Sequence, residues 1–96
     1  MHVISRTKLR EVWVVDRELE KALRAWVKVV ESAKWQRFSD VRAAIKHADQ
    51  VDRFTVFNIL RNRFRLLCVI HYNRGKVYIR HIFSHAEYDR GGWKRE

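Results

Sequence analysis

Three strand-like segments follow one another closely in the second half of the chain, and they constrain its fold more than any other feature. Residues 54–59, 64–71 and 76–83 are rich in β-branched and aromatic side chains. Only short polar segments separate them, Arg61-Asn62 and Asn73-Arg74-Gly75, and the second is typical of a hairpin turn. Short connections join neighbouring antiparallel strands, so the sequence predicts three consecutive antiparallel strands.

Apolar and polar side chains alternate along the last two of these segments, which assigns a face to each residue. With an even number of residues in the hairpin loop, both apolar sets meet one core, and Arg65 and Arg80 share the opposite face, exposed. The sequence therefore predicts one apolar sheet face and one open face that is cationic and partly aromatic. The predicted apolar side chains are Phe64, Leu66, Cys68, Ile70, Val77, Ile79 and Phe83, with His81 on the same face.

The first half of the chain has helical periodicity instead. Residues 1–4 predict a short edge strand, and Ser5 is the expected N-cap of a helix to about Val15. Asp16 is the expected N-cap of a second helix to about Ala33, whose apolar seam is Leu19, Ala22, Leu23, Trp26 and Val30. Ser39 is expected to cap a short helix over residues 40–46, and a loop over residues 47–52 leads into the sheet.

This order of elements predicts an α+β domain, with an N-terminal strand and two to three helices packed on one face of an antiparallel sheet. Ninety-six residues fit one domain, residues 1–96. Periodicity is lost at the end, so residues 89–96 are expected to form a loose tail unless a partner holds Trp93. The single cysteine, Cys68, cannot form an internal disulfide and is expected to be a buried thiol.

The net charge of +10 is unevenly distributed. The first 52 residues contain 11 Lys and Arg against 8 Asp and Glu, whereas the last 44 contain 10 against 3. The sheet half therefore predicts a surface for a polyanion, although the arginines could instead only keep a sheet edge soluble. No apolar run approaches the ~20 residues of a membrane span, and neither a signal peptide nor a basic amphipathic helix is evident, so a cytoplasmic protein without a membrane partner is expected.

Four groups of residues stand out by their order and spacing: Met1 to Ser5, Val56 to Ile59 with Asn62 and Arg65, Tyr78 to Arg80, and His85 with Glu87, Tyr88 and Asp89. They resemble the HigB-type toxins, which belong to the RelE-like superfamily of bacterial toxin–antitoxin systems. The resemblance spans nearly the whole chain in order and spacing, although Arg61 stands where the family usually has a glycine. It implies a RelE-like fold, an mRNA interferase that cuts mRNA on translating ribosomes, and inhibition by a helix-turn-helix antitoxin of the HigA type.

Cleaving RNA without a metal requires a base for the 2′-hydroxyl proton, fixed cations for the phosphorane charge and an acid for the leaving oxygen. Arg65 and Arg80 suit the second task, because a guanidinium binds phosphate oxygens and stays charged. His85 suits proton transfer, Tyr88 could stack on a base, donate a proton or position the phosphate, and Asp89 could orient His85, cap the turn or pair with an arginine. The expected further RNA contacts are Arg61, Asn62, Arg63 and Lys76.

Two other functions remain open from the sequence. The same basic face could belong to a non-catalytic RNA- or ribosome-binding module, and some relatives in the superfamily poison DNA gyrase instead. Cys68, His71, His81 and His85 could suggest zinc, but they lack the spacing of a metal motif, so no metal site is predicted. No cofactor is expected, because the sequence contains no P-loop or dinucleotide fingerprint.

Overall fold

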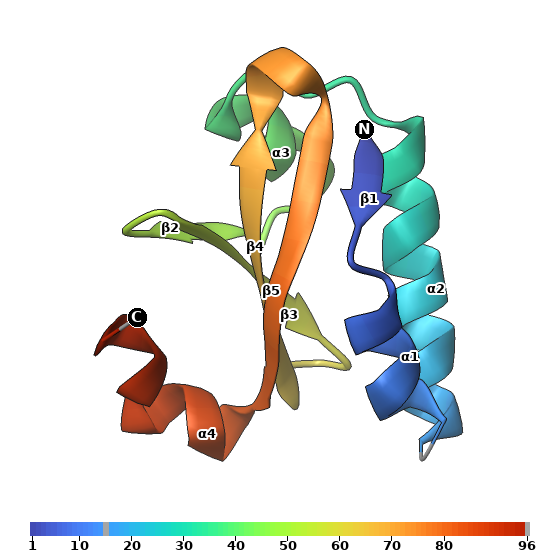
Figure 1. Ribbon diagram of the computed structural model, residues 1–96, viewed down its shortest axis with the longest axis vertical. Coiled ribbons are helices and arrows are strands. Elements are labelled where there is room, and N and C mark those ends of the chain that lie inside the picture. The colour runs from blue at the N-terminus through green and yellow to red at the C-terminus, as the bar shows by residue number, and fades with distance from the viewer. Residues whose placement is uncertain (15, 96) are drawn as a thin grey trace.

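Five strands form one sheet, in the order β1-β5-β4-β3-β2 (Figure 1). The computed structural model describes residues 1–14 and 16–95, without the side chains of residues 94 and 95. β1 (His2–Ile4) runs parallel to β5 (Lys76–Ser84), and the other neighbours are antiparallel. The three predicted strands are β3 (Phe54–Ile59), β4 (Phe64–His71) and β5, as expected. β2 (Asp49–Val51) lies where a loop was predicted, and pairs with β3.

Two helices, α1 (Thr7–Trp13) and α2 (Arg17–Ser32), lie on one side of the sheet (Figure 1). Asp16 caps α2 as predicted, because its carboxylate accepts hydrogen bonds from the backbone N–H groups of Glu18 and Leu19. The prediction for α1 was wrong at its start: Arg6 occupies the N-cap, and Ser5 precedes it with a positive φ of 71°. The expected end of α1 at Val15 lies outside the described residues.

The remaining helices are short. α3 (Phe38–Ala44) starts earlier than predicted, so Ser39 lies inside it and the N-cap is Arg37. α4 (His85–Arg90) follows β5 directly, and the 3₁₀ segments are η1 (Tyr72–Arg74) and η2 (Gly92–Arg95). Within the described residues, none of these helices is long and apolar enough to cross a bilayer. The α+β class is therefore confirmed, with a mixed rather than wholly antiparallel sheet.

The main core lies between α2 and the sheet. Leu19, Leu23, Trp26 and Val30 of the predicted α2 seam are all buried, which confirms their assignment. The indole of Trp26 meets the ring of Phe57 edge to face, with centroids 5.3 Å apart. The buried sheet residues of this core are Val3, Phe57, Ile59, Leu66, Cys68, Val77 and Ile79.

A β-bulge in β5 changes which side chains face the helices. Leu67 pairs with His81 and Cys68 pairs with Ile79, so Arg80 is the extra residue and has no partner on β4. Beyond the bulge the alternation is reversed. The assignment of Phe83 and His81 to the helix-facing side was therefore wrong: the two rings stack on each other, 5.1 Å apart, on the opposite face.

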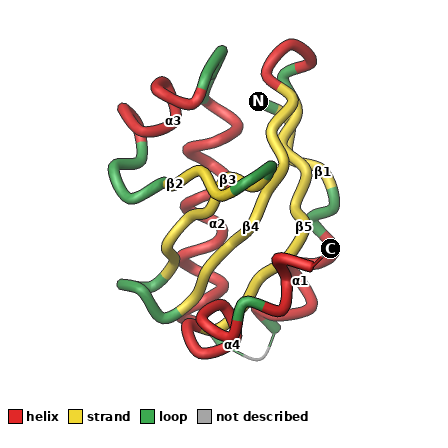
Figure 2. The backbone as a smooth tube through the Cα atoms, turned by 90° about the vertical axis from the view of Figure 1, so that its left-hand side faces the viewer, coloured by secondary structure: helices red, strands yellow, loops and turns green. Residues whose placement is uncertain are grey.

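Figure 2 shows the sheet from the face opposite α1 and α2, with α2 behind the strands. This face carries a second, smaller apolar core. It consists of Phe54, Val56, Leu67 and Trp93, which are all buried. Trp93 is only 4% exposed, because η2 folds its indole against the ring of Phe54. Two predictions were therefore wrong. The second core partly covers the sheet face that was expected to be open, and residues 89–90 and 92–93 belong to α4 and η2 instead of forming a loose tail. Glu96 lies outside the described residues.

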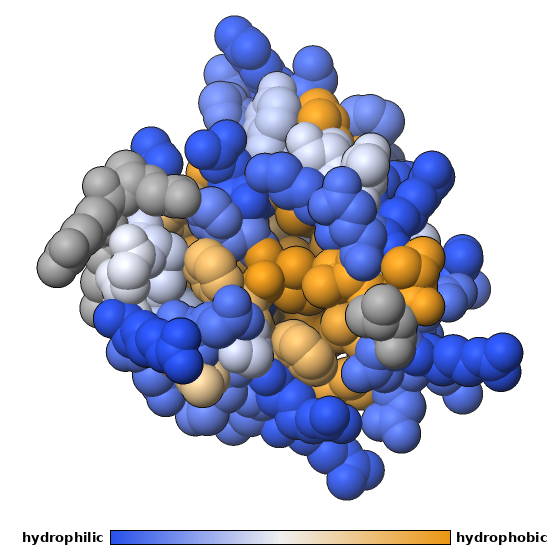
Figure 3. Space-filling model, turned by 60° about the horizontal axis from the view of Figure 1, so that its bottom comes forward, coloured by the Kyte–Doolittle hydropathy of each residue, from blue (hydrophilic) through white to orange (hydrophobic). Residues whose placement is uncertain are grey.

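Hydrophilic side chains dominate the end of the molecule that carries α4, and one apolar patch interrupts them (Figure 3). Among the described residues, Val14 at the end of α1 is the most exposed large hydrophobic residue, with 74% of its surface accessible. The surface at this end is therefore polar but not uniformly so.

Candidate active site

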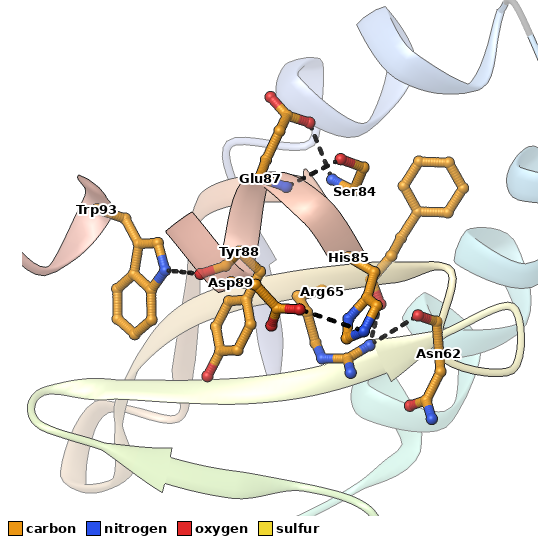
Figure 4. A network of polar contacts seen from close by, with 9 residues as sticks. Asn62, Arg65, Ser84, His85, Glu87, Tyr88, Asp89 and Trp93 are labelled. Atoms are coloured by element: carbon orange, nitrogen blue, oxygen red, sulfur yellow. Dashed lines mark hydrogen bonds and ion pairs between the residues drawn. The ribbon is translucent and has the colours of Figure 1, made fainter. Parts of the chain in front are cut away.

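The end of β5 and the start of α4 place three of the predicted site residues together (Figure 4). Ser84 ends the strand and caps the helix: its hydroxyl accepts a hydrogen bond from the N–H of Glu87, and the Glu87 carboxylate accepts one from the N–H of Ser84. The hydrogen bond from the backbone N–H of Ser84 lowers the pKa of the Glu87 carboxyl group, and the Ser84 hydroxyl lowers it further. The N–H of His85 donates to the carbonyl of Arg63, 2.9 Å away, which ties the helix to the β3–β4 turn.

Arg65 lies beneath α4, and its guanidinium is held by the turn before it. Nη1 donates to the carbonyl oxygen of Asn62 at 3.0 Å and approaches that of Phe64 at 3.4 Å. The guanidinium carbon lies 5.6 Å from the centroid of the Tyr88 ring, within cation–π range. Arg65 was expected to be exposed but is only partly so, which means that its cation is held in a defined place.

His85 and Asp89 stand one helical turn apart and face each other (Figure 4). Nε2 of His85 lies 3.3 Å from Oδ2 of Asp89. Both side chains stay largely open to solvent, with 55% of His85 and 60% of Asp89 exposed. An accessible imidazole beside a carboxylate can exchange protons with a bound substrate.

Tyr88 connects this group to the second core. Its ring stacks on Trp93 with centroids 4.9 Å apart, and its carbonyl accepts a hydrogen bond from the Trp93 indole. Loss of solvation raises the pKa of Tyr88, and the carboxylate of Asp49 raises it further, while Arg65 lowers it. The phenol therefore stays protonated near neutral pH and can donate a hydrogen bond, but it is a poor base.

The β3–β4 turn has a backbone that only a few residue types adopt easily. Leu60, Arg61 and Asn62 have positive φ angles of 51°, 51° and 76°. The exposed side chains of Arg61 and Asn62 line a cavity of about 430 Å³ together with His47 and Asn58. Asn58 is also the cross-strand partner of Arg65, so this cavity adjoins the site.

His47 is a residue that the sequence analysis missed. It precedes β2, in the segment predicted to be a loop, and no spacing motif singles it out. The signal that could have identified it is the register of β2 with β3, in which Asp49 pairs with Val56. Two residues before Asp49, the same register sets His47 opposite Asn58. Recognising β2 as a strand would thus have brought a second imidazole to this corner of the sheet.

Three predicted residues lie elsewhere. Arg63 points towards the helices, where its guanidinium lies 3.6 Å from the carboxylate of Glu18. Lys76 begins β5 at the far end from α4. Arg80 is exposed and lies three residues along β5 from Phe83, the partner of Arg65, which is about 10 Å of strand. The structure thus unites Asn62, Arg65, His85, Tyr88 and Asp89, but does not bring Arg80 to the same point.

Cysteine and histidine residues do not gather in a metal-like cluster in the described part of the chain, where no three His, Cys, Asp or Glu side chains could hold one ion. Cys68 is fully buried, and its burial raises the pKa of the thiol well above the usual value. It therefore contributes to packing as a small apolar side chain.

A sheet with helices on one face, and a cation–imidazole–phenol cluster at the end of its last strand, is the arrangement that the sequence resemblance led us to expect of a RelE-like toxin. Residues 19–91 match the family described as HigB_toxin, the RelE-like toxic component of a toxin–antitoxin system, and the chain belongs to this family. The resemblance stated from the sequence is thereby confirmed.

Individual relatives are distant but match almost end to end. The chain is 24% identical over 93 residues to the mRNA interferase HigB of Escherichia coli (strain CFT073), a match that covers 94% of this chain and 90% of that protein. It is also 24% identical over 92 residues to the mRNA interferase HigB of Shigella flexneri, covering 93% of this chain and 88% of that protein.

Proposed function

We propose that this toxin is an mRNA interferase, an endoribonuclease that cuts mRNA on translating ribosomes and so inhibits translation. The observation that carries this function is the Arg65 guanidinium, held by the carbonyl of Asn62 and the ring of Tyr88 beside the His85–Asp89 pair. Relatives that match over almost the whole chain are named mRNA interferases, which supports the same reaction.

The reaction is a transesterification of the RNA backbone. The 2′-oxygen forms a bond to the adjacent phosphorus, the bond from phosphorus to the 5′-oxygen breaks, and a 2′,3′-cyclic phosphate and a 5′-hydroxyl result. Arg65 stabilises the charge on the phosphorane, and Tyr88 donates a hydrogen bond or stacks on a base. His85 transfers one proton, and Asp89 fixes the orientation of its ring. His47, which lines the adjoining cavity with Asn62, is a candidate for the second proton transfer.

This chemistry needs no metal ion as a Lewis acid, since a guanidinium can neutralise the phosphorane and imidazoles can move the protons. We therefore expect cleavage to persist when a chelator is added in excess over divalent cations, under conditions in which the ribosomes are kept intact by polyamines. Loss of cleavage that returns with one particular metal would contradict this part of the proposal.

Ribosome dependence follows from how open the site is. His85 and Asp89 are both more than half exposed, and Arg65 is the one predicted phosphate-binding arginine at this place. Such a site gains most when another body holds the RNA in a reactive geometry, which can be worth ~7–11 kcal/mol. The net charge of +10 favours docking on ribosomal RNA. The proposed partners are thus mRNA, the ribosome and a HigA-like helix-turn-helix antitoxin, all in the cytoplasm.

The deciding experiment is induced expression in a bacterium, with transcript ends mapped across coding regions. Wild type should create new ends, and Arg65→Ala should cut ~10²–10³ times more slowly, the usual loss for one charge-stabilising donor. Arg42→Ala is the matched control: it removes one exposed arginine from α3, far from the site, and should cut like wild type.

Each other result has a clear meaning. Growth arrest without new transcript ends would favour a non-catalytic ribosome-binding module. Growth arrest with damaged DNA and intact transcripts would favour a gyrase poison. Equal effects of Arg65→Ala and Arg42→Ala would show that only the number of positive charges matters, and would overturn the assigned site.

A further inference from the structure

A second cavity on the same sheet face contains charged and aromatic groups that the cleavage site does not use. Its volume is about 280 Å³, and we name it the sheet-face cavity. It lies between the β2–β3 turn, which projects away from α1 and α2 (Figure 1), and the upper parts of β4 and β5. The lining residues are Arg53, Val69, His71, Tyr78 and Arg80.

Arg80 lies at the β-bulge and lines this cavity. Arg80 has no partner on β4, and its carbonyl accepts a hydrogen bond from Nζ of Lys8 at 3.0 Å. Its exposed side chain lies on the same strand face as Tyr78, two residues earlier, and both line the cavity with Val69, the cross-strand partner of Tyr78. Bulges are common beside functional surfaces.

The cavity combines cations and rings without an acid. Arg53 lies 5.0 Å from the centroid of the Phe54 ring, and His71 meets Tyr78 edge to face at 5.0 Å. No carboxylate within residues 1–14 and 16–95 forms an ion pair with Arg53 or Arg80. Guanidinium groups next to aromatic rings are suited to a nucleotide, because the cations bind the phosphate and the rings stack on the base.

The larger cavity between α1 and α2 differs in this respect. It is also rich in arginine, but Arg6 pairs with Glu31, and Arg24 pairs with Glu20 and lies over the Trp13 ring. Two of its four cations are thus already partnered, and the carboxylate of Glu31 belongs to its lining. Among the described residues, the lining of the sheet-face cavity contains, in contrast, two arginines and no carboxylate, which favours an anion there.

We propose that the sheet-face cavity is a second RNA subsite, which holds one nucleotide of the mRNA at a distance from the phosphate that is cut. The proposal rests on the proposed function, since it takes mRNA as the substrate. His81 and Phe83 stack on each other along β5, between the cavity and α4, and both are only partly buried. They give the RNA an aromatic path from one subsite to the other. Arg80 is then a residue for binding and positioning, not one that acts on the phosphorane.

The test measures binding of a labelled single-stranded RNA of about twelve nucleotides, in a His85→Ala background that keeps the RNA intact. Tyr78→Ala should weaken binding by about 5- to 100-fold, and Tyr78→Phe should restore it. Arg53→Ala and Arg80→Ala should each weaken binding, and should each lower the slope of log affinity against log salt by about 0.7. Arg74→Ala, which removes an arginine from the same hairpin outside the cavity, is the matched control.

If Arg53→Ala and Arg80→Ala bind RNA like Arg74→Ala, with the same salt dependence, the subsite is refuted. Vacant ribosomes distinguish the source of the RNA. Variants that no longer bind the oligonucleotide but still bind vacant ribosomes support mRNA as the ligand. Variants that still bind the oligonucleotide but no longer bind vacant ribosomes would overturn mRNA in favour of ribosomal RNA. Cleavage mapping in cells decides the proposed function separately, because an oligonucleotide can bind whether or not it is cut.

Discussion

At the scale of single residues, the site depends on arginines that the structure separates into different roles. Arg65 is held by a carbonyl and an aromatic ring next to His85, whereas Arg80 lies at a bulge with Arg53 and Tyr78. Arg63 instead approaches Glu18 at the start of α2. Residues that look equivalent along a strand therefore meet different partners, because their directions depend on the register of the whole hairpin.

Arg61 gives a residue-scale prediction about stability. Its φ of 51° lies in the left-handed region, which costs a non-glycine residue roughly 1–2 kcal/mol, and the family usually has a glycine there. Arg61→Gly should therefore raise the free energy of unfolding by about 0.5–1 kcal/mol in urea denaturation, part of the gain being offset by the flexibility of glycine in the unfolded chain. Arg63→Gly is the control, since Arg63 has no positive φ; it should destabilise. A less stable Arg61→Gly protein would show that the arginine side chain stabilises the turn.

At the scale of elements, α4 is a short helix that depends on its cap. Ser84 and Glu87 form the capping box, and Gly91 ends the helix with a φ of 72°. The three side chains of α4 in the proposed site, His85, Tyr88 and Asp89, take their positions from these few backbone contacts. A helix of six residues would not be stable alone, so its cap and its tertiary packing together position the site.

The cap yields a prediction for Ser84→Ala. Losing the hydroxyl should cost about 1 kcal/mol of stability, and should also reduce mRNA cleavage, because His85 loses its fixed position. Thermal melting and cleavage mapping measure the two effects. Ser39→Ala is the matched control, because Ser39 lies inside α3, whose N-cap makes no side-chain hydrogen bond. If both variants behave alike, α4 does not depend on its capping box.

The buried C-terminal segment gives a second element-scale prediction. Trp93 is 4% exposed and contacts both Tyr88 and Phe54, so Trp93→Ala should lower the free energy of unfolding by ~3–5 kcal/mol, as for other buried aromatic residues. Chemical denaturation measures this directly. A change below about 0.5 kcal/mol, typical of an exposed site, would show that η2 is detached in solution.

At the scale of the whole molecule, two cores of different size share one sheet. The larger core joins the sheet to α1 and α2, and the smaller one is closed by η2 on the opposite face. Cys68 lies within the larger core, and Tyr88 packs against the smaller one. Folding therefore raises the pKa of an ionisable group in or beside each core, the Cys68 thiol and the Tyr88 phenol.

This arrangement predicts a loss of stability in alkali. Burial raises the pKa of Cys68, of Tyr72 and of Tyr88, so above the usual tyrosine value of ~10 the unfolded chain binds fewer protons than the folded one. The stability that these groups contribute is present at neutral pH and is lost as the pH rises through their folded-state values. Urea denaturation between about pH 9 and pH 11 should show this decrease, and Tyr88→Phe, which cannot ionise, should lose less over the same interval. An equal decrease in both proteins would exclude Tyr88 as a source.

The amino-acid sequence by itself determined the features that depend on neighbouring residues. The strands β3, β4 and β5, the apolar seam of α2 and its Asp16 cap were all predictable, because strand alternation, helical periodicity and capping are set within a few residues. The grouping of His85, Tyr88 and Asp89 was predictable for the same reason, since one short turn contains them all.

Only the tertiary structure decided which distant residues meet. The bulge at Arg80 reverses the alternation of side chains along β5. No local sequence pattern predicts it, because it arises from the pairing of β5 with β4 over their whole length. The pairing of β2 with β3 brings His47 to the site, and η2 buries Trp93 against Phe54. Each of these contacts joins segments that are separate in the sequence or too short to show a period, so the free energy that selects them comes from long-range packing and strand pairing.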